Sequence, residues 1–161
     1  MTDSNVSDAL RASPLAAELD DAQCRTLADL MTLQPLADGD VLVREGTADS
    51  RLYLLVAGNA AVTRGAGTAE AMTLFTLSPG EAIGEMSFLD GNVHYASVVA
   101  QGPGRVLALD RVQLESLLDR EPHIVYRIMR AIVRRVHQAQ HRLSAQAVEL
   151  HNYIYKQHGR Y

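Results

Sequence analysis

The chain has 161 residues, of which 47% are hydrophobic and 21% charged, a balance typical of a folded protein and not of a disordered one. No apolar run is long enough to cross a bilayer, and the polar, acidic N-terminus lacks the features of a signal peptide, so we expect a soluble, cytoplasmic protein. The single cysteine, Cys24, excludes an intrachain disulfide and an all-cysteine metal site.

The net charge of −4 is unevenly distributed along the chain. Residues 120–161 carry eight Lys/Arg and two acidic residues, a net charge of +6, whereas the preceding residues carry −10. Such asymmetry can mark a nucleic-acid or membrane surface. Because the basic residues are not clustered or interleaved with aromatics, we interpret them as the solvated face of a helix balanced by an acidic body.

The first thirty residues predict short helices. Ser7 or Ser13 is suited to cap one of them, and Pro14 suits a first helical turn. The segment 22–31 predicts an amphipathic helix with Leu27 on its apolar side.

From residue 33 to residue 109 the pattern changes to short apolar or alternating runs separated by turn signals, among them 57–59 and 102–104. Many short strands at near-even spacing predict a sandwich or barrel-like all-β body, and the lack of alternating helices argues against a doubly wound sheet. The predicted strands are 33–36, 41–43, 52–56, 60–63, 72–77, 96–100 and 106–109.

The C-terminal third predicts two helices. Asp110 is a good N-cap for a helix that continues through Leu118. Pro122 suits the first turn of a second helix, and no Gly or Pro follows until Gly159. This permits a helix of about 35 residues.

The long helix carries an apolar seam with alternating spacings of three and four over about four heptads, which predicts a coiled-coil homodimer. A helix packed only on its own domain is the alternative, which we favour less because the seam continues far past the body. The polar seam residue Gln146 is of the kind that fixes register. The predicted interface consists of Met129, Ile132, Val136, Ala139, Leu143, Gln146 and Leu150.

Three motifs lie in order along the β region: GDVLVREG at 39–46, LYLLVAG at 52–58, and IGEMSFL at 83–89 followed by ASV at 96–98. Together they resemble the cyclic-nucleotide-binding domain superfamily, as in the regulatory domain of Crp/Fnr-type bacterial regulators, and the third resembles its phosphate-binding cassette. The resemblance implies a mainly β fold with α: a jelly-roll-like β-roll flanked by short N-terminal helices and a long C-terminal dimerisation helix. The implied domains are a ligand-sensing β-roll at 1–121 and the coiled-coil helix at 122–158.

The cassette resemblance implies a ligand site in which Gly84 turns into a short helix whose N-terminus suits a phosphate. Glu85 matches the family glutamate that accepts hydrogen bonds from the ribose hydroxyl. The family arginine, which pairs with the cyclic phosphate, falls on His94 in this sequence, and the following Ser/Thr falls on Tyr95. The implied ligand-binding residues are Gly84, Glu85, Met86, Ser87, His94, Tyr95, Ala96 and Ser97.

The departure at His94 makes the cassette degenerate. Imidazole offers no bidentate fork and is only partly charged at neutral pH, so the loss of the arginine costs roughly a hundredfold in affinity for a cyclic phosphate. Other arginines are alternative sources of the charge, and the sequence does not place them: Arg44, Arg51, Arg64 and Arg105.

Two functions remain open. The first is a stand-alone homodimeric sensor that binds cAMP, cGMP, a cyclic dinucleotide or a similar anion in a non-standard way and signals through its long helix to an unidentified partner protein. The second is a ligand-free dimerisation and protein-interaction module. A truncated Crp/Fnr-type transcription regulator is less favoured, because no helix-turn-helix follows the long helix and DNA is therefore not an expected partner.

We expect no enzymatic activity, no membrane partner and no metal site. No nucleophile, base and acid stand in a catalytic order, and His137 and His141 lie four residues apart without an evident third ligand.

Overall fold

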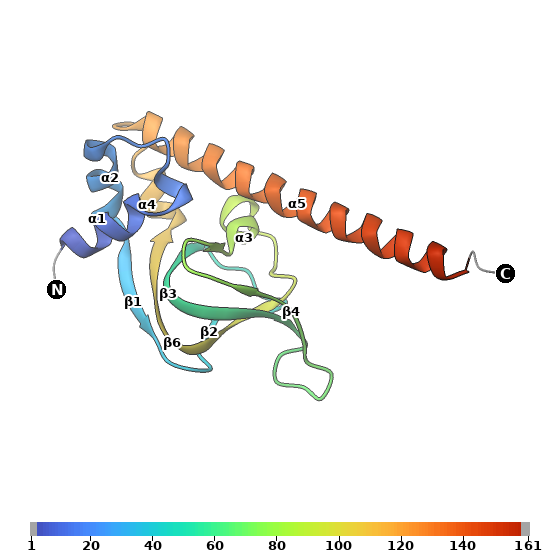
Figure 1. Ribbon diagram of the computed structural model, residues 1–161. Coiled ribbons are helices and arrows are strands. Elements are labelled where there is room, and N and C mark those ends of the chain that lie inside the picture. Colours follow the sequence, from blue (N-terminus) through green and yellow to red (C-terminus); the bar gives the residue numbers. More distant parts are fainter. Residues whose placement is uncertain (1–2, 159–161) are drawn as a thin grey trace.

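The computed structural model describes residues 3–158, and within them the side chains of residues 6–141, 144–149, 151 and 152 (Figure 1). The elements in chain order are α1 (Asp3–Arg11), a 3-10 turn (Pro14–Ala16), α2 (Asp21–Ala28), β1 (Thr32–Leu36), β2 (Val41–Val43), β3 (Arg51–Arg64), β4 (Met72–Leu77), β5 (Ala82–Ile83), α3 (Glu85–Asp90), β6 (Ser97–Asp110), α4 (Arg111–Glu115) and α5 (Pro122–His158).

Two long strands organise the sheet. β3 and β6 pair antiparallel from Arg51 opposite Asp110 to Thr63 opposite Ser97. β1 and β2 add to β6, while β4 and β5 add to β3, giving one antiparallel six-stranded sheet. The sheet curls into the predicted β-roll, with α1, α2 and α4 gathered at one end, α3 beneath α5, and α5 leading away (Figure 1).

The prediction that residues 57–59 and 102–104 form turns between separate strands is wrong. β3 continues through the first segment and β6 through the second. The register between the two strands shifts on both sides of Ala57, as expected where a β-bulge bends a pair of strands.

The physical reason is a close contact between the two glycine segments. A Cβ atom on Gly58 would lie 2.7 Å from the carbonyl oxygen of Pro103, and one on Gly104 would lie 2.5 Å from the carbonyl oxygen of Ala57. Only glycine permits this approach of two backbones. These residues therefore mark a shared bend inside the paired strands.

The first half of β3 is buried on both faces. Leu52 and Leu54 pack in a core beneath the helices, whereas Tyr53 and Leu55 pack in a second core inside the roll. β6 alternates in the same way, with Leu107 and Leu109 in the first core and Val106 and Ala108 in the second. The paired strands are thus the wall between two cores.

Two aspartates cap the first turns of helices. The side chain of Asp110 accepts a hydrogen bond from the backbone of α4, and Gln113 completes a capping box; Asp20 and Gln23 do the same for α2. The prediction of an N-cap at Asp110 is confirmed, although α4 ends at Glu115 and is shorter than predicted. Pro122 begins α5 as expected.

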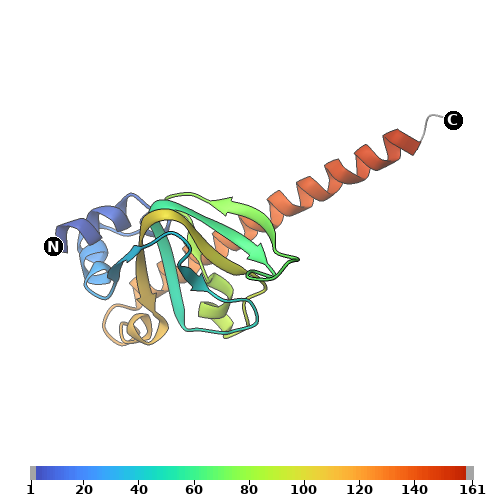
Figure 2. The same cartoon turned by 90° about the horizontal axis from the view of Figure 1, so that it is seen from below.

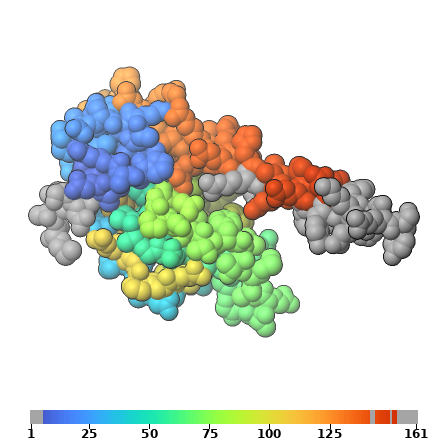
Figure 3. Space-filling view, viewed as in Figure 1, coloured from blue at the N-terminus to red at the C-terminus, as the bar shows by residue number. Residues whose placement is uncertain are grey.

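α5 docks on the body through its first part. Ile124, Ile128 and Ile132 have no exposed area and pack in the core beneath the helices. Ile132 was expected at a dimer seam, and this assignment is corrected: it faces its own chain, because core packing and a coiled-coil seam have the same helical spacing. Beyond Ile132 every described side chain of α5 is exposed or only partly buried, and the helix projects from the body (Figures 2 and 3).

Three arginines of α5 attach the N-terminal helices. Arg127 donates hydrogen bonds to the backbone oxygen of Glu18, at 3.0 Å, and to the side-chain oxygen of Gln23, at 2.6 Å. Arg130 and Arg134 form ion pairs with the Glu18 carboxylate. No described helix is both long and apolar enough to cross a membrane.

Substitution of Ile128 by Ala should lower the free energy of unfolding by about 2–5 kcal/mol, because it leaves a cavity where α5 meets the core. Val112→Ala is the control, since Val112 is 68% exposed and should cost about 0.5 kcal/mol or less. Urea denaturation followed by circular dichroism measures both. Equal effects of the two substitutions would contradict the docking of α5 on the core.

Candidate functional site

The predicted cassette is built where β5 turns into α3. β5 pairs with β3, placing Ile83 opposite Tyr53. Gly84 then adopts a left-handed conformation (φ +84°) and precedes the first residue of α3, Glu85. A Cβ atom on Gly84 would lie 3.0 Å from the carbonyl oxygen of Arg51, so the turn needs glycine both for its dihedral angle and for this close approach.

Ser87 fixes α3 to the loop that precedes β3. Its buried hydroxyl donates to the carbonyl oxygen of Asp49 at 2.8 Å and accepts from the Asp49 N–H at 2.9 Å. Ser87 was predicted to contact a ligand, but its hydroxyl is used by the backbone at Asp49. It therefore positions that loop beside the cassette.

His94 is attached to the same loop from the other side. Its N–H donates to the carbonyl oxygen of Thr47, and its carbonyl oxygen accepts from the N–H of Gly46, both at 2.8 Å. Its side chain is only 7% exposed, and Nε2 lies 3.6 Å from the nearer oxygen of Asp49. This separation is too long for a hydrogen bond, so Nε2 is a buried polar atom without a hydrogen-bond partner.

The other predicted ligand residues separate into two groups. Ala96 and Ser97 are buried, and the Ser97 hydroxyl accepts a hydrogen bond from the N–H of Glu45 at 2.9 Å. Met86 and Tyr95 are instead 47% and 60% exposed. The two exposed side chains are available at the surface of the cassette, whereas the two buried ones belong to the roll.

Glu85 is the main titratable group of the cassette. Burial raises the pKa of its carboxyl group above the ordinary value, and nearby Glu81 adds to this. Its own backbone N–H and the positive charge of Arg135 oppose the rise in pKa. Burial and the charge of Glu85 also raise the pKa of Tyr95, which shows that the phenol and the carboxylate are electrostatic neighbours.

Arg135 connects α5 to this cluster. Its Nη1 donates to the carbonyl oxygen of Gly80 at 3.3 Å, just before β5, and its buried Nε has no hydrogen-bond partner. Neither Arg135 nor Asp49 was predicted from the sequence. Arg135 lies seven residues after buried Ile128 and therefore continues the docking face, a period that could have revealed it. Nothing in the sequence pattern indicated Asp49.

Two of the four alternative arginines are paired with other carboxylates and do not supply a charge to the cassette. Arg51 pairs with Asp110 at 3.7 Å, and Arg64 pairs with Glu45 at 3.2 Å. Among the described side chains, no group of three or more His, Cys, Asp or Glu residues could hold a metal ion.

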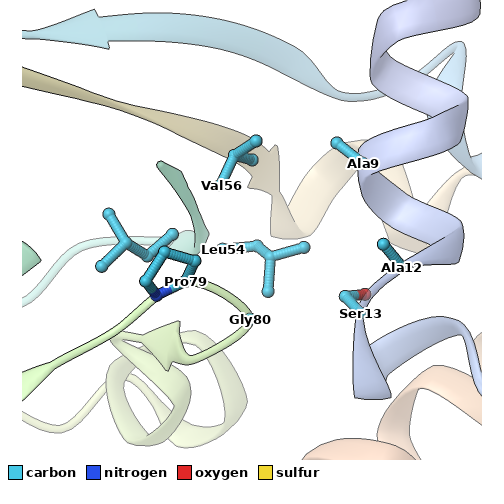
Figure 4. A pocket seen from close by; sticks show the side chains of 8 residues that line it. Ala9, Ala12, Ser13, Leu54, Val56, Pro79 and Gly80 are labelled. Carbon is cyan, nitrogen blue, oxygen red and sulfur yellow. The ribbon is translucent and has the colours of Figure 1, made fainter. Parts of the chain in front are cut away.

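Two hollows lie outside the cassette. One of about 220 Å³ separates α1 from β3 and the turn before β5 (Figure 4); it is lined by Ala9, Ala12, Ser13, Leu54, Leu55, Val56, Pro79 and Gly80. The other, of about 310 Å³, is lined by Thr32, Gln34, Arg51, Ala108, Asp110 and Gln113. Gly80, which receives the hydrogen bond from Arg135, links the first hollow to the cassette cluster.

Known proteins share this sequence pattern. Residues 33–121 match the cyclic nucleotide-binding domain family. The chain is 32% identical over 112 residues to cGMP-dependent protein kinase, isozyme 1, of Drosophila melanogaster (68% of this chain, 15% of the kinase). It is 33% identical over 101 residues to the cyclic AMP receptor protein of Thermus thermophilus (63% of this chain, 47% of the relative). The chain thus spans less than half the length of either relative.

Solved structures share the fold. A cyclic nucleotide-binding domain from Methylobacillus flagellatus superposes with a TM-score of 0.75 at 23% identity, covering 91% of this chain and 82% of that one. The regulatory domain of Toxoplasma gondii PKA with cAMP gives 0.69 at 19% identity (84% and 50%). A cAMP-independent PKA regulatory subunit from Trypanosoma cruzi, bound to guanosine, gives 0.62 at 23% identity (78% and 47%). From the family match over 33–121 and the shared β-roll, we conclude that the chain belongs to the cyclic nucleotide-binding domain family.

Proposed function

We propose that this protein is a homodimeric sensor that binds a cyclic nucleotide, or another ligand with a ribose ring, at the cassette without the usual arginine. Ligand binding shifts the position of α5, and this shift is transmitted to a partner protein. cAMP and guanosine, held by two structural neighbours, both contain a ribose. The proposal therefore commits to that ring and to Glu85 as its acceptor.

The observation that carries the proposal is the desolvated carboxylate of Glu85. Burial of this group is unfavourable for its charged form, as its raised pKa indicates. Carboxylates whose pKa is perturbed by desolvation and by a specific charged neighbour cluster at functional sites. Adjacent ribose hydroxyls are suitable donors, because each donates one hydrogen bond to an ionised carboxylate.

Arg135 gives the cassette a route to α5. The Arg135 charge acts on Glu85, and its Nη1 holds the carbonyl oxygen of Gly80. A ligand whose hydroxyls compensate the Glu85 charge weakens the pull of that carboxylate on Arg135. This differential interaction favours one position of α5 over another, which is what a ligand-driven shift requires.

Dimerisation follows from the exposed part of α5. The helix runs more than two dozen residues beyond Ile132, and most of the stability of a protein helix comes from packing of its apolar face and not from helix propensity. Met129, at 36% exposed, and the partly buried or exposed Val136, Ala139 and Gln146 remain on the proposed seam. The side chains of Leu143 and Leu150 lie outside the described residues. A second copy packed along this seam supplies the missing support.

A ligand-free dimerisation module is the second candidate. It is favoured by one observation, namely that His94 is buried beside Asp49 and does not present a charge at the surface of the cassette. In this case the exposed part of α5 alone carries the function.

Ligand binding is tested by thermal denaturation of the full chain with a panel of cyclic nucleotides, nucleotides and nucleosides. At least one should stabilise the protein, by about 2.7 kcal/mol at a hundredfold excess over Kd. Glu85→Ala and a 2′-deoxy ligand should each abolish the effect, whereas Glu115→Ala on α4 should preserve it. If every compound leaves the wild-type melting curve unchanged, the ligand-free module is the correct function.

Glu85→Gln should stabilise the ligand-free protein at pH 7 by about 1 kcal/mol or less, since it removes a desolvated charge and keeps the shape of the side chain. Burial raises the pKa in the folded state, so the stabilising contribution of the protonated carboxyl is complete below its ordinary pKa of 4.5 and is lost as pH rises through the raised value. The difference between variant and wild type should therefore grow with pH. Urea titrations between pH 4 and pH 8 measure it, and a difference independent of pH would argue against a desolvated Glu85.

Two adjacent lysine substitutions test the seam. Ala139→Lys places a charge on the predicted interface and should raise the dimer dissociation constant at least about tenfold, because the charge must lose its water and faces its own copy. Gln138→Lys, also exposed but off the seam, should leave it within about threefold. Light scattering and sedimentation of the full chain measure both. A monomeric wild type, or equal effects of the two lysines, would exclude this seam.

A further inference from the structure

A polar hollow lies outside the cassette, at the end of the second core. The strands β1, β6 and β3 run side by side there, with Ala108 of β6 between Thr32 of β1 and Tyr53 of β3. Directly paired residues of neighbouring strands point to the same face of a sheet. Tyr53 and Ala108 belong to the second core, and the small side chain of Ala108 leaves room for a hollow of about 310 Å³.

Two opposite charges share the rim of this hollow. Arg51 and Asp110 are the next pair along β3 and β6, and their side chains remain 52% and 33% exposed. Asp110 uses Oδ1 to accept from Ser50 and from the first turn of α4. Its Oδ2 accepts no hydrogen bond from a described group, because Nε of Arg51 is 3.7 Å away. A hydrogen bond with Tyr53 raises the pKa of Arg51, so the guanidinium is a permanent cation that is only loosely paired.

The rest of the polar lining is uncharged. Thr32 and Gln34 come from β1, and their side chains make no hydrogen bond to another described residue. Gln113 of α4 uses its Oε1 to accept from the Asp110 N–H at 3.3 Å, which leaves its amide nitrogen as a donor. A hydroxyl and two amides, each with hydrogen-bonding capacity to offer, thus surround the charged pair. In the cassette, by contrast, the hydroxyl of Ser87 is already used by the backbone.

The pattern of charges selects a ligand that carries both signs. An anion alone meets the Asp110 carboxylate, and a cation alone meets the Arg51 guanidinium, so each is opposed by one of the two groups. A molecule whose carboxylate and ammonium group are attached to one carbon places the first against Arg51 and the second against Oδ2 of Asp110, in charge-assisted hydrogen bonds. The hollow lies at the lower end of the range of small-molecule pockets, so the molecule is small.

We propose that this hollow is a second ligand site and that it binds a free α-amino acid. The α-carboxylate pairs with Arg51, the α-ammonium group pairs with Asp110, and Thr32, Gln34 and Gln113 contact the side chain of the ligand. None of the proposed ligand residues of the cassette takes part, so this site goes beyond the sensor function proposed above.

The test is a nuclear magnetic resonance titration of the isotope-labelled full chain with each of the common amino acids. At least one should bind, with the largest shifts at the backbone amides of residues 32–34 and 108–113. Its N-acetyl derivative lacks the ammonium group, and its primary amide lacks the carboxylate. Each derivative should bind more weakly by about tenfold or more, because each loses a hydrogen bond between charged groups.

Two variants each remove one charge from the hollow. Arg51→Gln and Asp110→Asn should each weaken binding of the amino acid by about tenfold or more. Asparagine caps a helix about as well as aspartate, so Asp110→Asn keeps the start of α4, and circular dichroism checks that both variants remain folded. Arg44→Gln and Asp119→Asn remove the same charges from exposed positions outside the hollow and should leave the affinity within about threefold.

The outcomes separate this inference from the sensor function. Binding of an amino acid without stabilisation by any nucleotide or nucleoside supports the hollow and overturns the sensor. Stabilisation by a nucleotide without binding of any amino acid overturns the hollow alone, and absence of both overturns both. Equal binding of the free amino acid and its N-acetyl or amide form overturns the zwitterionic ligand. An affinity unaffected by both Arg51→Gln and Asp110→Asn overturns the location of the site.

Discussion

The structure depends on one close contact between two strands. At Gly58 and Gly104 the backbones of β3 and β6 approach more closely than any side chain would allow. All other described strands pair with one of these two, so the bend lies in the pair that carries the whole sheet. The same pair of strands separates the two cores, and β5, which leads into the cassette, is attached to β3. The position of the candidate site therefore depends on this pair of strands, through the pairing of β5 with β3.

Local features could be predicted from the sequence, because the residues that cause them are neighbours in the chain. The cap at Asp110, the start of α5 at Pro122 and the turn at Gly84 each need only a few consecutive residues. The bend at Gly58 could not be recognised, since a turn and a bulge have the same glycine signature. Only the facing segment at 102–104, far along the chain, distinguishes them.

The site was predicted in part for the same reason. The cassette motif located Glu85 and His94, but the groups that determine their electrostatics come from other elements. Asp49 lies 45 residues before His94, and Arg135 comes from the far end of the chain. Ile132 illustrates a different limit, because helical spacing describes an apolar face without identifying what packs on it. Tertiary contact decided that Ile132 packs on its own chain.

The first part of α5 contacts two regions of the protein, the N-terminal helices and the cassette side. Arg127, Arg130 and Arg134 hold the N-terminal helices, and the next residue, Arg135, reaches the cassette side of the molecule. Successive residues on a helix point about 100° apart, so a rotation that improves one set of contacts withdraws the other. The N-terminal helices therefore oppose any movement of α5 toward or away from the cassette.

The exposed part of α5 turns this arrangement into a lever. From Ile132 to the last helical residue, His158, the helix extends about 40 Å at about 1.5 Å per residue. A tilt of about 10° at the docked part displaces the far end by about 7 Å, a movement larger than the rise of one helical turn. In the proposed sensor, small changes in the hydrogen bond between Arg135 and Gly80 are magnified along α5, so a protein bound at the far end would experience them as a change of position instead of a change of charge.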